Sequence, residues 1–221
     1  MGAVSGGYRK SDEVRARLLD TAEELFAERG FYGVSVRDIT VRAELRSASV
    51  NYHFETKEKL FLAVIDRRIE PLAKLRMERL DDVDVSPGSP EETVRSIADA
   101  FAGPMLDLAS GGSRGWKNYC ILIAHLAVQK MWTDNIVSEK YDVHARKFVE
   151  ALKQTFPDAE DYRIHCAFQF LLSTTLYAVC DNKRLDTLSQ DQYRSADLSR
   201  LREPFLDFVS AGIISTAQAP S

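Results

Sequence analysis

Two pairs of cysteine and histidine are the residues in this 221-residue sequence whose types could do covalent chemistry. A thiolate beside an imidazole can act as a nucleophile; Cys120 lies five positions before His125, and His165 is adjacent to Cys166. In a helix, however, residues five positions apart point to different faces, and adjacent residues diverge by about 100°. Neither pair is accompanied by a glycine-rich phosphate loop or by metal-ligand spacing. We therefore expect no enzyme activity, no cofactor and no metal site.

A short segment from position 47 to 54 has residues suited to recognition instead. If the segment is helical, Val50 and Phe54 lie on one buried face because they are four positions apart. The outward face is small and polar with one aromatic residue: Ser47, Ala48, Asn51 and Tyr52. Small side chains let a helix backbone approach the base edges of DNA, and asparagine can pair with adenine. Ala48 and Ser49 can meet thymine methyl groups or phosphates, so the segment predicts a helix that reads DNA.

Lys57 is a cation in the first turn of the next helix, where it should cost a few tenths of a kcal/mol, roughly, by opposing the helix dipole. A phosphate group would compensate, because helix N-termini bind anions through their free amides. Thr56 is placed to cap this helix, and Tyr52 and His53 can donate to the same phosphate strand. We expect Lys57 to clamp a phosphate beside the reading helix.

The apolar spacing predicts the elements that position these groups. Apolar residues recur at helical period almost throughout, and no run alternates as a strand would, so we expect an all-α protein of about nine helices. Ser35 and Asp38 form a capping box that opens a helix over 36–43. That helix, a turn of three or four residues and the 47–54 helix have the lengths of a helix-turn-helix.

The other helices follow from the same period and from the breakers between them. They are expected at 12–29, 57–80, 91–109, 116–130, 133–155, 158–181 and 198–214. The breaker-rich segment 81–90 and the polar run 182–196 interrupt the pattern. We expect an N-terminal three-helix DNA-binding domain over 11–56 and a C-terminal helical domain over 57–215. Residues 1–10 and 216–221 are expected to be disordered.

Composition restricts the class of protein but does not point to nucleic acid. With 29 Lys and Arg against 33 Asp and Glu, the net charge is -4, so a DNA-binding prediction rests on local geometry alone. The apolar content of 45% is enough for a substantial core, and the three cysteines are expected to be reduced core residues. The N-terminus has no apolar run of a secretory signal and no stretch predicts a membrane span, so we expect a cytoplasmic protein.

Four runs together resemble the DNA-binding domain of the tetracycline-repressor (TetR) family. They are FYGVSVRDI at 31–39, AEL at 43–45, VNYHF at 50–54 and KEKL at 57–60. The aromatic residue, the cap, the turn, the aromatic cluster and the lysine occur in order and at the right separations. The resemblance spans about residues 12–62, and the all-helical remainder has the length of the family's ligand-binding and dimerisation domain.

The resemblance implies a role for each matching residue. Arg37, Ser47 and Ala48 match positions that reach bases. The matches to phosphate-holding positions are Ser35, Ser49, Asn51, His53 and Lys57. Two residues depart from the family pattern. Glu44 replaces the usual turn glycine and must adopt a left-handed conformation at some cost. Arg46 replaces the usual small polar cap of the reading helix, so either Arg46 contacts DNA itself or Ser47 takes over the cap.

The C-terminal domain has no sharp motif, but its apolar residues suggest two surfaces. A small, apolar effector is expected to bind among the middle helices, at a cavity lined by Phe101, Met105, Trp116, His125, Trp132, Phe148 and Phe168. The resemblance to the TetR family implies that the last two long helices pack with those of a second copy as a four-helix bundle. The residues expected at that homodimer interface are Phe168, Leu172, Leu176, Phe205, Phe208 and Val209.

These inferences predict a transcriptional regulator, most simply a repressor, that binds a palindromic operator on double-stranded DNA as a homodimer. A small-molecule effector would release it from DNA, and no membrane takes part. The alternative is a ligand-binding or adaptor protein on the same scaffold that has lost specific operator recognition. Glu44 and Arg46 are the residues that favour this alternative, because both depart from the family pattern.

Overall fold

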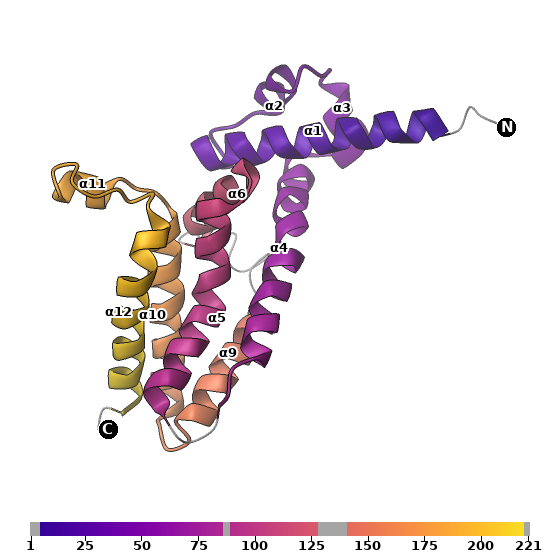
Figure 1. Cartoon of the computed structure of the whole chain (residues 1–221). Helices are drawn as coiled ribbons and strands as arrows, with labels where there is room; N and C mark the ends of the chain where they lie inside the picture. Colours follow the sequence, from indigo (N-terminus) through magenta and orange to yellow (C-terminus); the bar gives the residue numbers. More distant parts are fainter. Residues whose placement is uncertain (1–4, 86–88, 128–140, 219–221) are drawn as a thin grey trace. The chain divides into compact units, whose positions relative to one another are not determined.

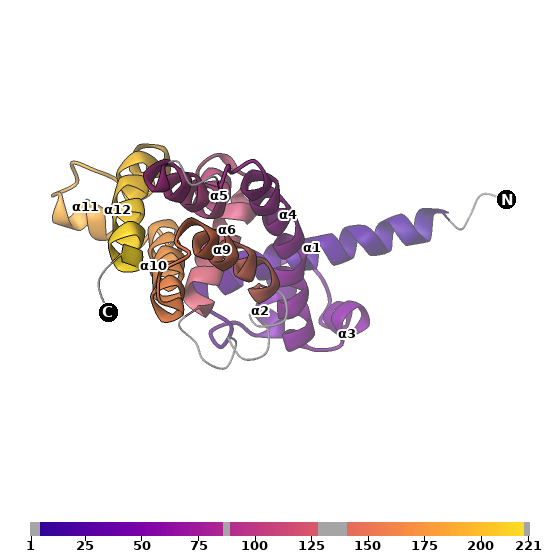
Figure 2. The same ribbon diagram turned by 90° about the horizontal axis from the view of Figure 1, so that it is seen from below.

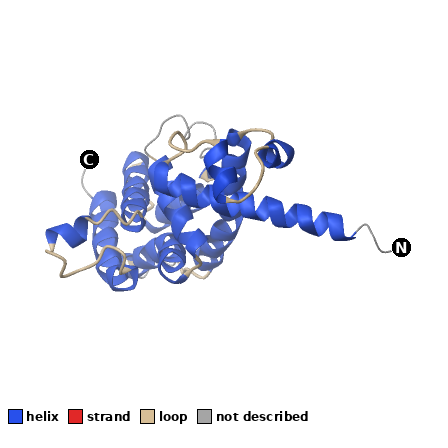
Figure 3. Cartoon of the chain, turned by 90° about the horizontal axis from the view of Figure 1, so that it is seen from above, coloured by secondary structure: helices blue, strands red, loops and turns tan. Residues whose placement is uncertain are grey.

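The computed structural model describes residues 5–85, 89–127 and 141–218, and these residues form helices joined by turns and loops with no strand (Figure 3). The expected all-α class is therefore confirmed. The described helices are α1 (Ser5–Arg29), α2 (Val36–Arg42), α3 (Ala48–Phe54), α4 (Lys57–Asp81), α5 (Pro90–Gly111), α6 (Arg114–Leu126), α9 (Asp142–Thr155), α10 (Asp161–Val179), α11 (Arg184–Leu188) and α12 (Leu198–Gln218) (Figure 1). None of the described helices is long and apolar enough to cross a membrane.

The chain divides into two compact units, Met1–Arg68 and Ile69–Ser221, and the division falls inside α4. We refer to them as unit 1 and unit 2. The first half of α4 thus packs in unit 1, and its second half packs in unit 2. The domain boundary expected before Lys57 remains a prediction.

Unit 1 is built around the apolar face of α1. Leu18, Leu25 and Phe26 are buried there, and the ring of Phe26 meets the ring of Phe61 from α4 edge-on at a centroid distance of 5.0 Å. Gly30 ends α1 with a φ of +69°, and its amide donates to the carbonyl of Phe26 at 2.9 Å. This is the left-handed helix end that glycine allows at least cost. The buried Phe26 and the left-handed Gly30 therefore determine the direction in which the chain leaves α1.

A buried carboxylate also ties α1 to the first half of α4. Glu23 is 1% exposed and pairs with two arginines, Arg67 at 2.8 Å and Arg68 at 3.1 Å. Because a buried carboxylate is costly without a partner, this three-residue cluster holds α1 and α4 in one relative position within unit 1.

Unit 2 has α5 at its centre. This helix packs against α6, α9, α10 and α12, and Figure 2 shows α5, α10 and α12 side by side. Phe101 lies midway along α5, and its ring meets Phe148 of α9 at 5.1 Å and Phe168 of α10 at 5.2 Å, both edge-on. These aromatic contacts join three helices that are distant in the sequence.

Two of the sequence expectations need correction, and a third falls partly outside the described residues. Residues 5–10 belong to α1 and residues 216–218 to α12, so the expected disorder is wrong for them. Helices extend by backbone hydrogen bonds past the last apolar residue, and apolar spacing therefore underestimates their length. The polar run 182–196 contains a short helix, α11, whose Asp186 is buried and accepts the amide of Ser195 at 2.6 Å. Of the helix expected over 133–155, the structure describes α9, and residues 128–140 lie outside the described residues.

Candidate nucleic-acid interface and ligand cavity

The start of α2 is fixed by the capping box expected from the sequence. The amide of Asp38 donates to Ser35 Oγ at 3.1 Å, and the amide of Ser35 donates to Asp38 Oδ2 at 2.8 Å. The Ser35 hydroxyl also donates to Asp38 Oδ2, and these hydrogen bonds lower the pKa of the Asp38 carboxyl below its usual value. Two of the unpaired amides at a helix start are thereby satisfied, which confirms the capping box.

Glu44 forms the turn between α2 and α3 without a glycine. Its φ is 55°, in the left-handed region that was expected. The amide of Leu45 donates to the carbonyl of Thr40 at 2.8 Å and closes the turn. The helix-turn-helix therefore forms with glutamate at this position, and the local strain does not prevent it.

The α3 helix presents the outward face that the sequence predicts. Val50 and Phe54 are buried at 0% and 6% exposure, whereas the outward residues are all exposed: Ser47, Ala48, Asn51 and Tyr52. Tyr52 is 80% exposed, and its ring meets the half-buried ring of His53 edge-on at 4.9 Å. Ser47 occupies the N-cap position, one residue after Arg46, but its hydroxyl makes no capping bond. The helix start is thus shifted by one residue, and Arg46 stays outside the helix.

Two arginines beside this face have no acidic partner among the described residues. Arg37 and Arg46 are exposed and take part in no ion pair there, whereas the neighbouring Arg42 pairs with Glu24 at 2.9 Å. Unpaired guanidinium groups on a surface are suited to bidentate contacts with guanine edges or phosphates. Arg37 and Arg46 are therefore the strongest candidates for contacts with an anionic partner.

Lys57 has partners within unit 1 that the sequence did not reveal. Its Nζ donates to the carbonyls of Phe31 at 3.1 Å and Val34 at 3.0 Å, and it lies 4.0 Å from the centroid of the Phe31 ring. These contacts offset the unfavourable position of a cation at a helix start. From the sequence, a phosphate was expected to provide this compensation. An ammonium group has three donors, so one remains for an anion. The structure also confirms the Thr56 cap, which accepts the amide of Lys59 at 3.2 Å.

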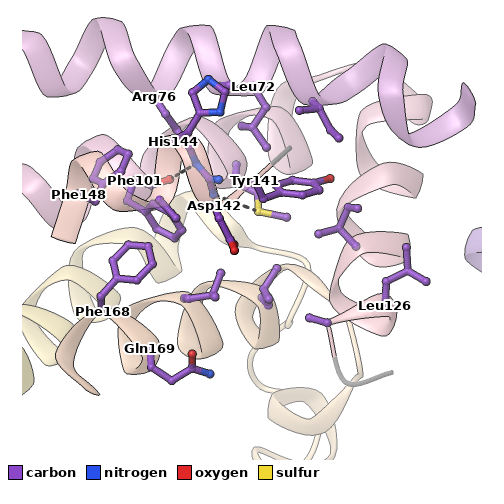
Figure 4. A pocket seen from close by; sticks show the side chains of 18 residues that line it. Leu72, Arg76, Phe101, Leu126, Tyr141, Asp142, His144, Phe148, Phe168 and Gln169 are labelled. Carbon is purple, nitrogen blue, oxygen red and sulfur yellow. Dashed lines mark hydrogen bonds between the residues drawn. The ribbon is translucent and has the colours of Figure 1, made fainter. Parts of the chain in front are cut away.

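Unit 2 encloses a cavity of about 330 Å³ between the second half of α4, α5, α6, α9 and α10. Its walls are largely apolar, with Leu72, Phe148 and Phe168 among them, and Figure 4 shows polar side chains from α4 and α9 at its edge. Tyr141, directly before α9, also lines the cavity, and its hydroxyl lies 2.5 Å from that of Tyr119. Burial raises the pKa of Tyr119 well above its usual value, so the Tyr119 hydroxyl is neutral.

Arg76 is a cation on the wall of this cavity. It is 9% exposed, its Nε donates to the carbonyl of Phe101 at 2.8 Å, and its guanidinium lies 3.9 Å from the centroid of the Phe101 ring. Burial lowers its pKa to about 10, so Arg76 remains a cation near neutral pH. The apolar spacing indicates a buried position here, because Arg76 shares the α4 face of Ile69, Leu72 and Ala73.

Both parts of the chain match family profiles. Residues 18–64 match "Bacterial regulatory proteins, tetR family", and residues 99–212 match "Tetracyclin repressor-like, C-terminal domain". The transcriptional repressor KstR2 of Rhodococcus jostii is 48% identical over 199 residues, which cover 86% of this chain and 92% of KstR2. The chain belongs to the TetR family.

Other TetR-family relatives match over a smaller region. HTH-type regulators of Mycobacterium bovis and Mycobacterium tuberculosis are 42% identical over 64 residues, which is 29% of this chain and 34% of their own length. Among solved structures, the ketosteroid transcriptional regulator KstR2 of M. tuberculosis gives a TM-score of 0.56 at 21% identity, covering 90% of this chain and 93% of that chain. FadR of Bacillus subtilis, solved with stearoyl-CoA, gives 0.58 at 16% identity, covering 89% and 98%. These structural likenesses support the TetR fold.

The cavity expected in a TetR-family protein is lined by only part of the predicted set. Phe101, Met105, Phe148 and Phe168 line it. Trp116 and His125 do not line it: Trp116 packs edge-on against Tyr119 at 5.8 Å, and His125 is exposed on α6. Apolar neighbours in the sequence had suggested a buried imidazole, but the His125 side chain is exposed. Trp132 lies outside the described residues.

The residues expected at a dimer interface are mostly used within the subunit. Phe168, Leu172 and Leu176 line the cavity, and Phe205 and Val209 are buried against the core of unit 2. Phe208 is different, since it is 70% exposed. It shares a groove between α10 and α12 with Phe170, which is 58% exposed. The apolar character of these residues could not show which of them are buried within the subunit and which lie on the exposed face of α10 and α12.

Proposed function

We propose that this TetR-family protein is a repressor that binds a palindromic operator as a homodimer and is released by a small, largely apolar effector. The observation that carries the proposal is the small, polar and fully exposed face of α3, held by the buried Val50 and Phe54. Helices of this kind enter the major groove in helix-turn-helix proteins. Since its partner is DNA, the protein acts in the cytoplasm, and it is not an enzyme.

The candidate DNA-contacting residues divide into two proposed roles. Arg37, Arg46, Ser47 and Ala48 contact base edges. The proposed phosphate contacts are Ser35, Ser49, Asn51, Tyr52, His53 and Lys57. Lys57 contributes its remaining donor, because two others are occupied by the carbonyls of Phe31 and Val34. The first group should determine which operator is bound, and the second should set the affinity for any DNA.

The effector site is the cavity of unit 2. Its volume of about 330 Å³ lies in the range of small-molecule sites. KstR2 of M. tuberculosis is named a ketosteroid transcriptional regulator, and FadR was solved with stearoyl-CoA, whose acyl chain is apolar. Both names favour an effector with an apolar part here. The same α4 helix begins at Lys57 and carries the cavity residues Leu72 and Arg76. A shift of α4 on effector binding lowers DNA affinity, and the coupling is reciprocal.

Selection of bound fragments from the source genome tests operator recognition. The full-length protein should recover a palindrome, and an operator beside its own gene would identify the regulated pathway. Recovery of DNA without a shared sequence would contradict specific binding. It would favour the alternative ligand-binding or adaptor protein, for which the departures at Glu44 and Arg46 are the supporting feature.

The dimer is proposed to form through the free face of α10 and α12. Phe208→Asp should leave the subunit folded, because the side chain is 70% exposed, but should place a charge in the four-helix bundle. Light scattering should show a monomer. Operator affinity should fall by about 100-fold or more, because the two DNA-binding domains no longer bind the operator together. Tyr32→Asp is the matched control, because Tyr32 is 69% exposed in unit 1 and should remain dimeric. An unchanged dimer for Phe208→Asp would exclude this face.

A further inference from the structure

Arg76 has more hydrogen-bond donors than the structure uses. A guanidinium group has five N–H donors. In this structure Nε donates to the carbonyl of Phe101 at 2.8 Å, and Nη2 makes a long contact of 3.8 Å with the sulfur of Met105. Nη1 has no hydrogen-bond partner among the described residues. Figure 4 shows the Arg76 side chain reaching from α4 into the group of side chains that line the cavity.

The charge of Arg76 is also not neutralised by the described part of the chain. No carboxylate there forms an ion pair with it, and the polar side chains beside it include the hydroxyl groups of Tyr119 and Tyr141. Asp142 lines the same cavity, but it does not pair with Arg76 (Figure 4). A buried cation without a counterion is costly, and such groups are normally paired.

We propose that Arg76 binds the carboxylate of an amphipathic acid whose apolar body fills the cavity. The inference rests on the proposed function and names the chemical class of its effector. The guanidinium makes a charge-assisted, two-pronged contact with the carboxylate through its free donors. Phe101, Phe148 and Phe168 surround the apolar body.

The cavity sets the size and direction of this acid. A cavity of about 150 Å³ holds benzene, so one of about 330 Å³ suits a body of roughly ten to twelve carbon atoms. The acid group must point to the α4 side of the cavity, because Asp142 would repel it at the start of α9. A neutral ligand of the same shape would leave Arg76 unpaired.

Matched pairs of ligands test the carboxylate directly. Decanoate is compared with decan-1-ol, and 2-naphthoate with 2-naphthalenemethanol, by calorimetric titration of the full-length protein near neutral pH. The two members of a pair share the apolar body and differ in charge. Arg76 should favour the acid by about tenfold or more in at least one pair. Equal binding of acid and alcohol, a preference for the alcohol, or no binding by either pair would overturn the assignment.

Three variants identify the residue that causes the preference. Arg76→Met should reduce the ratio of acid to alcohol affinity to about one, and binding of the alcohol shows that its cavity is intact. Arg76→Lys keeps the charge and should keep part of the preference. Asp142→Asn removes the repelling carboxylate and should bind the acid at least as tightly as the original protein. A preference for the acid that survives Arg76→Met would overturn the proposal.

Failure of this inference and failure of the proposed function give different results. If the effector is not an acid, genome-fragment selection still recovers an operator while acids and alcohols bind alike. If the protein is not an operator-binding regulator, no shared sequence is recovered, whatever binds in the cavity.

Discussion

Two cations on α4 are held in similar ways but have different numbers of unused donors. Lys57 in unit 1 and Arg76 in unit 2 each lie about 4 Å from the centroid of a phenylalanine ring, at 4.0 Å and 3.9 Å. Lys57 also donates to two backbone carbonyls, whereas Arg76 donates to one carbonyl and contacts a sulfur. Lys57 thus uses most of its donors inside unit 1, and Arg76 uses a minority inside unit 2.

The difference separates a cation that maintains the fold from one that is available for a ligand. Both side chains are at least half-buried, so their charge alone does not tell the two roles apart. The number of hydrogen-bond donors that already have a partner in the protein tells the two roles apart. Lys57 connects the start of α4 to the turn between α1 and α2 and so stabilises the helix-turn-helix, whereas Arg76 faces a cavity.

Replacing Lys57 should therefore have the largest effect on stability. Lys57→Met removes two hydrogen bonds from a charged donor and one cation–π contact, and should lower the free energy of unfolding of unit 1 by about 2 kcal/mol. Both tryptophans lie beyond residue 68, so hydrogen exchange of residues 5–68 during urea denaturation is the measurement that reports on unit 1.

Lys59→Met is the matched control for Lys57→Met. Lys59 lies two residues further on, its side chain is 55% exposed, and it pairs with the exposed Glu55. Its replacement should change stability by less than about 0.5 kcal/mol. Equal effects of the two variants would mean that the carbonyl contacts of Lys57 contribute little, and the two α4 cations would then not differ in this way.

The third donor of Lys57 predicts a smaller effect on DNA binding. Lys57→Met should weaken binding to operator and to random DNA by a similar factor, about fivefold to tenfold, because a phosphate contact carries no sequence information. The slope of log affinity against log salt concentration should become shallower by about one. If titrations at several salt concentrations give Lys57→Met the same slope as the original protein, Lys57 does not contact a phosphate and acts only inside unit 1.

Unit 1 was predicted well from the sequence because its determinants are local. Ser35 and Asp38 are three residues apart, and the buried and exposed faces of α3 follow from a helix of seven residues. The partners of Lys57 could not be predicted, because they are backbone carbonyls of Phe31 and Val34, and carbonyls are present at every residue. Residue types indicate an anion site at a helix start but do not exclude an internal partner.

Unit 2 was predicted less well because its cavity combines residues from five helices. Phe101 and Phe148 were predicted from their apolar character, and apolar character was sufficient to identify these two residues of the cavity wall. His125 was misplaced because adjacent helix residues point in directions about 100° apart, so His125 is exposed although the next residue, Leu126, is buried. Arg76 was missed because charge suggested a surface residue, although its spacing from Ile69 and Leu72 places it on the buried face.

Replacing Arg76 by methionine should have a smaller effect on stability than replacing Lys57, although Arg76 is the more buried of the two cations. Burial lowers the pKa of Arg76 to about 10 in the folded protein, below its usual value. The folded state therefore holds this proton less tightly, so the charge opposes folding at every pH below about 10. The opposition is relieved only as the pH rises above about 10.

Methionine removes this opposition together with the contacts to Phe101, and its length preserves much of the packing. Near neutral pH, Arg76→Met should thus change the free energy of unfolding of unit 2 by less than about 1 kcal/mol, measured by tryptophan fluorescence in urea. A loss as large as that of Lys57→Met would show that Arg76 maintains the fold of unit 2. A near-zero change would instead mean that the fold gains little from this buried cation, as expected for a charge that is stabilised when a ligand binds.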